Sequence, residues 1–258
     1  VGRPGAFENW KNDQQAFNEL LRRHVTSRDG ADHLIRLRVG ATTLRLGLMP
    51  AQLFPSGHVF FLQRMPYKLG ATPIAVHLTY QTCDAAGKRS RMREAGLWAL
   101  DPPAHLSPKG GLLTYTNHLP EELTSGFAPL SRDLRPDDEL VARHFRLMYH
   151  QIGQLRTALT LAIATNRTLV LPRFLCGLES VTNFAHNGVR CSGCAMDLPY
   201  WCPADHVLRM HYLEGSMPQK PRMRLPIAEH SLLAKRRGGV AADAIEVRLA
   251  GVEDAESC

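Results

Sequence analysis

The stretch LVARHFRLMYHQIGQLRTALTLAIATNRTLVLP, residues 140–172, decides the fold class. Its apolar residues recur at the spacing of one helix face, and they include Leu147, Ile152, Leu155, Leu159 and Ile163. This period predicts a helix over Leu140–Thr165 that stops at Asn166. The apolar run Thr168–Leu171, closed by Pro172, predicts a buried strand. A helix followed at once by an apolar strand is half of an α/β layer unit, so we expect an α/β fold.

Further elements are predicted on both sides of this stretch. Apolar residues at helical spacing predict a helix over Phe7–Arg23, and short alternating runs predict two strands on either side of Gly40. The continuous apolar run Ile74–Thr79 is typical of a strand buried on both faces of a sheet. The two strands beside Gly40 are Leu34–Val39 and Thr43–Leu48, and the remaining predictions are a strand at Pro203–Met210 and a helix at Gly87–Trp98.

Changes in composition divide the chain into four regions. Residues 1–119 form the first folded region, and residues 120–138, rich in Pro, Ser and acidic side chains, read as a linker. Residues 139–214 form a smaller α/β region that contains cysteines. Residues 215–258 are polar and rich in Arg and Pro, so we expect poor order there.

The overall charge narrows the classes of partner. The net charge is +7, with 44% hydrophobic and 21% charged residues, which is typical of a basic globular protein. A basic surface suits nucleic acid, an anionic membrane or a phosphorylated small molecule. No nucleic-acid-binding motif accompanies the spread-out basic residues, so we expect no nucleic-acid partner.

The chain begins at Val1 without Met, and we expect it to be a fragment of a longer protein.

Six cysteines are present, and four of them lie between Cys176 and Cys202. The spacing permits disulfides, free thiols or a zinc site. The loop lengths do not match those of a zinc ribbon or knuckle, which favours disulfides. The spacing alone does not assign a pairing.

Two N-terminal segments carry residues suited to chemistry. Asp13 and Gln14 place a carboxylate and an amide at one end of an anchored helix, where the alternative is an ordinary solvated face. Gly57 allows close approach of the backbone to a ligand, and His58 is a polar residue among aromatics. The alternative for the second segment is a loop whose buried aromatics lead into a strand.

The third segment combines an imidazole with a run of cations. His77 lies in the predicted apolar strand, where burial requires a hydrogen bond or a metal. Four cations follow within six residues, at Lys88, Arg89, Arg91 and Arg93. At a helix N-terminus they oppose the helix dipole, so the arrangement favours an anion such as a diphosphate among them. The alternatives are a satisfied core histidine and a solvated charge run.

The residues of these segments and the order of the segments resemble the nucleotide-diphospho-sugar transferase domain of plant and algal extensin arabinosyltransferases, glycosyltransferase family seventy-seven. The resemblance runs roughly from Phe7 to Val207, and the block His77–Glu94 is its most specific part. Other matching pieces are NDQ at 12–14, SG at 56–57, QLRTAL at 154–159, NRTLVLP at 166–172 and CPADHV at 202–207.

The resemblance implies the later part of a GT-A-like domain, followed by the smaller cysteine-containing α/β region. It implies a retaining transfer of arabinose from UDP-arabinofuranose to hydroxyproline-linked arabinosides of extensin-like glycoproteins in the Golgi lumen. It also implies a membrane anchor upstream and a divalent cation, usually Mn²⁺, held partly by an Asp-x-Asp pair. No such pair follows an apolar strand in these 258 residues, so we expect this chain alone to be inactive. The alternative is a non-catalytic module that binds glycoproteins or scaffolds a complex.

The resemblance also suggests roles for single residues. Asp13 and Gln14 become catalytic candidates near the sugar or the acceptor, and His77 becomes a candidate metal ligand. The candidates for holding the nucleotide sugar are His58, Lys88, Arg89 and Arg91. A disulfide between Cys176 and Cys202 is implied as well. Asn166 begins an Asn-Arg-Thr glycosylation sequon, which suits a lumenal protein.

Overall fold

The computed structural model describes residues 13–29, 34–127, 138–177, 198–215, 225–235 and 244–249. The chain forms two compact units, Val1–Pro50 and Ala51–Cys258. No helix within the described ranges is both long and apolar enough to cross a membrane. Cys191, Cys194 and Cys258 lie outside the described residues, as does most of the expected linker.

The first unit is a helix followed by a three-stranded antiparallel sheet. Helix α1 spans Asp13–His24, and the strands are β1 (Val25–Asp29), β2 (Leu34–Val39) and β3 (Thr42–Gly47). The helix predicted over Phe7–Arg23 is confirmed from Asp13 on, residues 7–12 lying outside the described residues, and the two predicted strands are confirmed. Gly40 turns between β2 and β3 with φ of +60°. Leu37 is the one buried apolar side chain among the side chains described in this unit. The unit therefore has very little core of its own.

The second unit is built on a four-stranded parallel sheet in the order β8-β5-β4-β9. Its strands are β4 (Leu112–Tyr115), β5 (Thr168–Val170), β8 (Ile227–Ala228) and β9 (Ala244–Val247). Helix α6 (Asp138–Ala164) connects β4 to β5 as a βαβ crossover. The helix and strand predicted from residues 140–172 are thus confirmed, and with them the α/β class.

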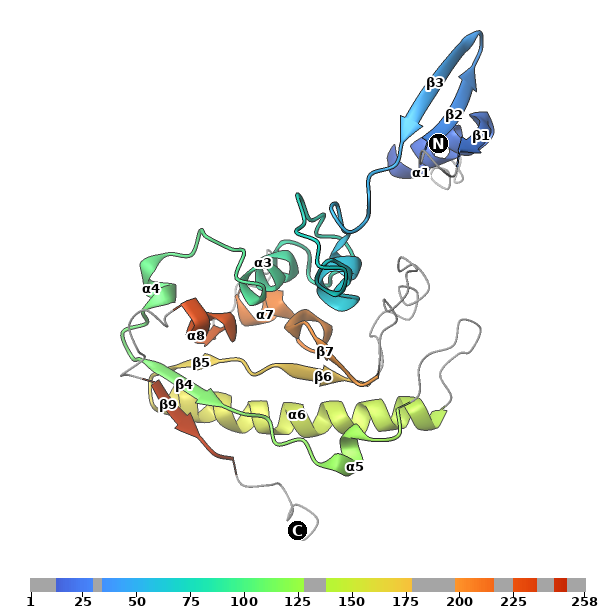
Figure 1. Cartoon of the computed structure of the whole chain (residues 1–258). Helices are drawn as coiled ribbons and strands as arrows, with labels where there is room; N and C mark the ends of the chain where they lie inside the picture. Colours follow the sequence, from blue (N-terminus) through green and yellow to red (C-terminus); the bar gives the residue numbers. More distant parts are fainter. Residues whose placement is uncertain are drawn as a thin grey trace, which may run out of the picture. The chain divides into compact units, whose positions relative to one another are not determined.

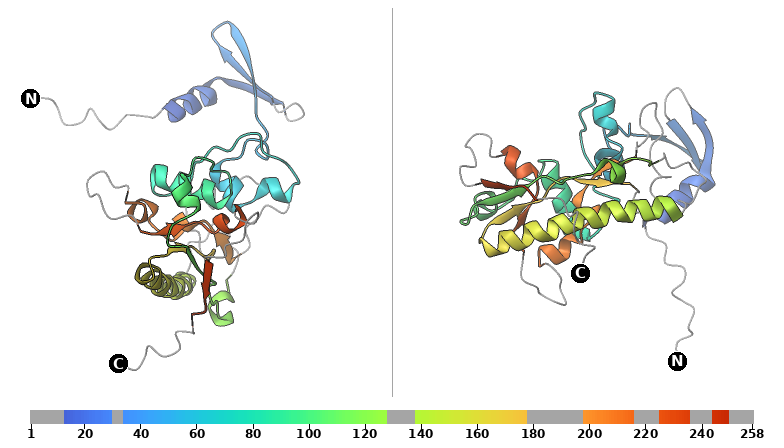
Figure 2. Two further views of the ribbon diagram at one scale, coloured as in Figure 1. Left: turned by 90° about the vertical axis from the view of Figure 1, so that its left-hand side faces the viewer. Right: turned by 90° about the horizontal axis from the view of Figure 1, so that it is seen from below.

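Helices cover the strands from two sides. Figure 1 shows α6 on one side of β5 and β6, and α3, α7 and α8 on the other. Seen from below, α6 runs along the strands (Figure 2). The shorter elements are η1 (His58–Leu62), α2 (Met65–Lys68), α3 (Asp84–Glu94), α4 (Pro103–Leu106), α5 (Glu121–Thr124), β6 (Phe174–Cys176), β7 (Tyr200–Cys202), η2 (Ala204–His206), α7 (Met210–Leu213) and α8 (Ser231–Lys235).

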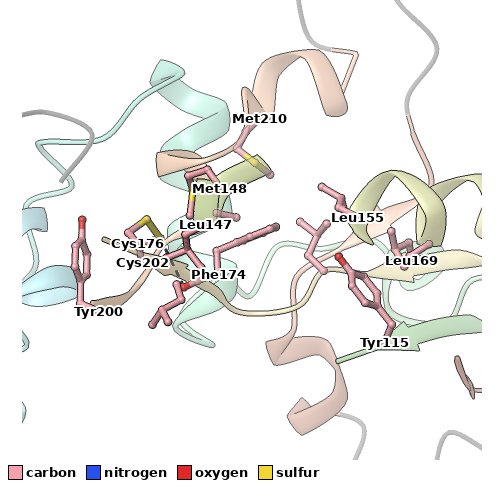
Figure 3. Packing of buried hydrophobic residues seen from close by; sticks show 14 of the residues in the cluster. Tyr115, Leu147, Met148, Leu155, Leu169, Phe174, Cys176, Tyr200, Cys202 and Met210 are labelled. Carbon is pink, nitrogen blue, oxygen red and sulfur yellow. Dashed lines mark hydrogen bonds between the residues drawn. A yellow bond between two sulfur atoms is a disulfide. The ribbon is translucent and has the colours of Figure 1, made fainter. Parts of the chain in front are cut away.

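The core lies between α6 and the strands, beside a disulfide. Cys176 and Cys202, the pair that the resemblance implied, are bonded and join β6 to β7. Leu147, Met148 and Phe174 lie close to this bond (Figure 3). A disulfide that closes a loop of this length contributes on the order of 3 kcal/mol in the chain-entropy account.

Two buried glutamines attach α6 to neighbouring backbone. Gln151 is fully buried, donates from Nε2 to the carbonyl of Leu175 at 2.9 Å and accepts from the Leu175 amide at 2.9 Å. Gln154 accepts from the amide of His118 and donates to its carbonyl, both at 2.8 Å. Burying an amide is favourable only when its hydrogen bonds are made, so these pairs specify where α6 docks.

Three predictions of local structure were wrong. Residues 74–79 form no strand, because their partner is a loop: the amide of Ile74 bonds to Leu53 and that of His77 to Pro55. The side chain of Ile74 is 70% exposed, so the run is not buried on both faces. For the aromatic run 58–62, the alternative of a loop that leads into a strand is wrong, because these residues form a π-helix. Residues 203–210 form a 3₁₀ turn and the start of α7.

The structure also divides the chain differently from the composition. The parallel sheet takes β4 from the first expected region, β5 from the cysteine-containing region, and β8 and β9 from the expected tail. Two short strands and α8 therefore form where we expected poor order. The two strands, β8 and β9, pair with β5 and β4 through backbone hydrogen bonds. A polar composition does not reveal this source of order.

Candidate functional site

The arginines of α3 are neutralised by carboxylates from distant segments. Arg91 donates from Nε to Oδ1 of Asp205 at 2.8 Å, and both side chains are at most 1% exposed. The other carboxylate oxygen of Asp205 accepts the backbone amide of Thr82 at 2.9 Å. A buried charge requires such a partner, because desolvation costs several kcal/mol per ion.

The neighbouring arginines are paired in the same way. Arg93 binds Oδ1 of Asp101 from Nε at 2.8 Å and Oε1 of Glu214 from Nη1 at 3.1 Å. Arg89 forms two hydrogen bonds to Glu214, which raise the pKa of the Arg89 guanidinium. Glu229 lies 3.7 Å from Arg93. We call Arg89, Arg91, Arg93 and their carboxylates the α3 charge network.

The start of α3 changes the dipole argument made from sequence. The helix begins at Asp84 rather than near Gly87, with an acidic residue in its first turn and Arg91 and Arg93 in its last. Cations in the last turn stabilise a helix, so no anion is required to offset them. Lys88, the fourth cation of the run, is exposed to solvent.

The two histidine candidates have different environments. His77 is exposed, and its backbone forms an isolated bridge to Ser56. His58 is buried in η1, edge-on to Tyr80 with ring centroids 6.1 Å apart. A Cβ added to Gly57 would lie 2.1 Å from the carbonyl oxygen of Thr79. Gly57 therefore allows close packing of two backbone segments rather than approach of a ligand.

The catalytic candidates Asp13 and Gln14 are exposed at the start of α1, in the first unit. The backbone amide of Gln14 donates to Oδ1 of Asp13 at 2.9 Å. Its side-chain amide donates to Asn18 at 3.4 Å. Local bonds of this kind stabilise the first turn of a helix. The other candidates, from His58 to Cys202, belong to the second unit.

The metal implied by the resemblance has no ligand set in the described ranges. No group of three or more His, Cys, Asp or Glu side chains there is arranged to hold an ion. His77 therefore belongs to no such group in that part of the chain. Because Mn²⁺ needs several converging oxygen or nitrogen ligands, these residues do not fit the ion, and we derive no step through it.

A pocket of about 330 Å³ lies in the second unit, at the carboxyl ends of two parallel strands. Pro172 and Arg173 follow β5, and His230 follows β8. Ligands of open α/β sheets bind at this edge, where loops leave the strands. The lining comprises Phe60, Phe61, Arg64, Tyr67, Glu94, Ala95, Pro172, Arg173, Phe174, Trp201, Cys202, Pro203 and His230.

Two arginines of this pocket lie against aromatic rings. The guanidinium of Arg173 is 4.8 Å from the ring centre of Trp201, and that of Arg64 is 5.3 Å from the ring centre of Tyr67. The carbonyl of Arg173 accepts a hydrogen bond from Asn117 at 3.1 Å, which holds its backbone in place. Stacking orients each guanidinium and leaves its N–H edge available to a ligand.

The carboxyl group of Glu94 and the imidazole of His230 in the pocket are both mainly uncharged at pH 7. Burial raises the pKa of Glu94 to about 8, although its carboxyl oxygen accepts the amide of Ala204 at 2.8 Å. Burial lowers the pKa of His230, and the charge of Arg173 lowers it further. At pH 7 the lining is therefore dominated by the positive charges of Arg64 and Arg173.

Sequence reasoning assigned no role to these pocket residues. Arg173 could have been noticed, because it follows the predicted strand Thr168–Leu171 and strand ends collect functional residues. Arg64 and Trp201 lie in segments without a recognisable pattern.

The glycosylation candidate Asn166 is exposed between α6 and β5 with φ of +52°, so its side chain is accessible on the surface.

Comparisons with known proteins found a matching family and a curated relative. Residues 6–92 match the nucleotide-diphospho-sugar transferase family. Arabinosyltransferase XEG113 of Arabidopsis thaliana is 35% identical over 209 residues, which is 81% of this chain and 30% of that protein. The chain thus spans about 30% of the length of this relative. No solved structure matches the chain.

Proposed function

Residues 6–92 belong to the nucleotide-diphospho-sugar transferase family, and from that premise we propose that the protein is an arabinosyltransferase. The observation that carries the proposal is the 35% identity to a plant arabinosyltransferase across 81% of the chain. The aligned length of 209 residues extends well beyond the family segment, so it includes much of the second unit.

The proposed donor is UDP-arabinofuranose, and the proposed acceptor is a hydroxyproline-linked arabinoside of an extensin-like glycoprotein. The proposed reaction is retaining and takes place in the Golgi lumen, with a membrane anchor outside this chain and a GT-A-like fold for the transferase domain. Two features are compatible with a lumenal protein: the Cys176–Cys202 disulfide and the exposed Asn166 of the sequon.

The manganese requirement remains a separate part of the proposal. The described residues supply no ligand set for the ion, so the chemistry argued from this chain concerns binding and charge rather than metal activation. In family members the metal would steady the negative charge of the leaving diphosphate. Within this chain, cationic side chains are the groups that can contribute to the same task.

The proposal is tested by donor screening with the full-length protein. UDP-arabinofuranose, UDP-arabinopyranose, UDP-xylose and UDP-glucose are each offered with a synthetic arabinosylated hydroxyproline peptide. We expect UDP release and a heavier peptide by mass spectrometry with the furanose donor only, dependent on added manganese, and little turnover by this chain alone. A protein that binds the peptide but transfers no sugar would overturn the enzyme proposal and support the non-catalytic binding module.

A further inference from the structure

Three arginines of α3 and two arginines of the pocket differ in their partners. Arg89, Arg91 and Arg93 are held by Asp101, Asp205, Glu214 and Glu229. Arg64 and Arg173 line the pocket and, within the described ranges, have no carboxylate within ion-pair distance. Their charge is therefore available to a ligand, whereas that of the α3 charge network is not.

The backbone at Arg64 is a second, independent observation. Arg64 immediately precedes α2 and has φ of +54° and ψ of +31°, the left-handed region that residues other than glycine seldom adopt. Such a conformation is strained and persists where the surroundings over-determine it, often at a ligand site. Here it places the guanidinium beside the Tyr67 ring at the pocket.

The aromatic rings at the pocket are more exposed than their size would favour. Tyr67 is 58% exposed and Trp201 is 46% exposed, and each carries a guanidinium on its face. Exposed aromatic surface beside cations suits a ligand that combines a flat or apolar ring with a polyanion. The pocket volume of about 330 Å³ lies at the small end of ligand sites, which suits the diphosphate and one attached ring.

We propose that this pocket binds the diphosphate of a nucleoside diphosphate, with Arg64 and Arg173 as the two cations that contact its oxygens. The inference rests on the proposed nucleotide-sugar chemistry, and it assigns the anion site to residues outside the Lys88–Arg93 run. Bidentate hydrogen bonding from a planar guanidinium matches phosphate oxygens better than an ammonium does. Asn117 donates a hydrogen bond to the backbone carbonyl of Arg173, and the Trp201 ring lies against its guanidinium. The guanidinium is therefore oriented before a ligand binds.

The test measures binding of UDP, UMP, uridine and inorganic diphosphate by calorimetry. The proteins are the full-length wild type, Arg64→Ala, Arg173→Ala and the double variant. Arg146→Ala is the matched control, since Arg146 is an exposed arginine of α6 paired with Glu139, away from the pocket. Lys88→Ala represents the rival site. Thermal melting confirms that each variant is folded.

We expect each pocket variant to weaken UDP and diphosphate binding at least tenfold and the double variant more, with uridine unchanged. Arg146→Ala and Lys88→Ala should bind like the wild type. Wild-type affinity in Arg64→Ala and Arg173→Ala, a tenfold loss in Lys88→Ala alone, or no UDP binding by the wild type would each overturn the inference. Arabinose transfer with unchanged UDP binding in the pocket variants would refute only the pocket. Arginine-dependent UDP binding without any transfer would refute only the proposed function.

Discussion

The second unit contains two sets of arginines that differ in their surroundings. The α3 charge network buries Arg91 at 1% exposure and binds each guanidinium to carboxylates. Arg64 and Arg173 are exposed and lie on aromatic rings at the edge of a pocket. The same side chain therefore stabilises the fold in one region and is free to bind a ligand in the other. What separates the two sets is whether a carboxylate lies within ion-pair distance of the guanidinium, although Nη1 and Nη2 of Arg91 are buried without a hydrogen-bond partner among the described residues.

The largest expected effect is the loss of Arg91. Arg91→Met leaves the buried carboxylate of Asp205 without its cation, and removing one partner of a buried pair destabilises a protein by about 3–5 kcal/mol. Urea denaturation measures the free energy of unfolding. The double variant Arg91→Met, Asp205→Leu should recover part of the loss, because neither charge of this pair is then left without its partner. A loss below about 1 kcal/mol in the single variant would remove the contrast between the two sets.

The next prediction concerns Glu94, which lines the pocket and stands beside the α3 charge network. Its pKa is about 8 in the folded protein against an ordinary value of 4.5, so the folded state keeps a proton that the unfolded state releases. The free energy of unfolding should therefore fall as pH rises from 4.5 to 8, by at most about 1.4 kcal/mol per pH unit from this group.

Glu94→Gln removes this titration and keeps an oxygen for the amide of Ala204. The stability of the variant relative to wild type should rise steadily between pH 5 and pH 8, measured by urea denaturation at each pH. Glu229, whose pKa is also raised, is present in both proteins and cancels from the difference. Parallel pH profiles for the two proteins would show that Glu94 is ionised throughout.

A smaller effect of opposite sign is expected at Arg64. Arg64→Gly relieves the left-handed backbone at φ of +54°, so we expect thermal stability to rise by about 0.5–1 kcal/mol relative to Arg64→Ala. The same substitution removes the guanidinium, so UDP binding should fall in both variants alike. A glycine variant more stable than the alanine variant, with UDP binding lost in both, would show that the strained backbone holds a side chain needed for binding. Equal stability of the two variants would mean that this backbone conformation carries no strain.

A change in stability of the same small size is expected at Arg173. Its guanidinium is exposed, and removing a solvent-exposed cation–π contact costs about 0.5–1 kcal/mol. Arg173→Ala should therefore melt close to wild type, in contrast to Arg91→Met. Differential scanning calorimetry of the two variants side by side checks this. A loss at Arg173 as large as that at Arg91 would place both arginines in the same structural class.

Much of the local structure could be predicted from the sequence. Helix α6 and strand β5 follow from periodicity within 33 consecutive residues, and β2 and β3 follow from alternation on either side of Gly40. The disulfide came from the family resemblance rather than from spacing. Residues 74–79 were misassigned because an apolar run is equally compatible with an extended segment that has only a loop for a partner.

The charge network and the pocket could not be predicted in this way. Arg91 and Asp205 are separated by 114 residues, and Arg89 and Glu214 by 125. A sequence window that contains four cations cannot show that their carboxylates lie so far along the chain. Likewise, Arg64 and Arg173 share a pocket only because η1, α2 and the end of β5 lie together in the fold.

The sequence by itself determined the α/β class, the long helix with its following strand, the family of residues 6–92 and the density of positive charge. Only the tertiary structure decided which of those charges are neutralised and which remain available at the pocket. The physical reason is range. Hydrophobic periodicity and secondary-structure propensity depend on residues that are close in the sequence. A buried cation is instead paired by whichever carboxylate the fold brings within about 3 Å of it.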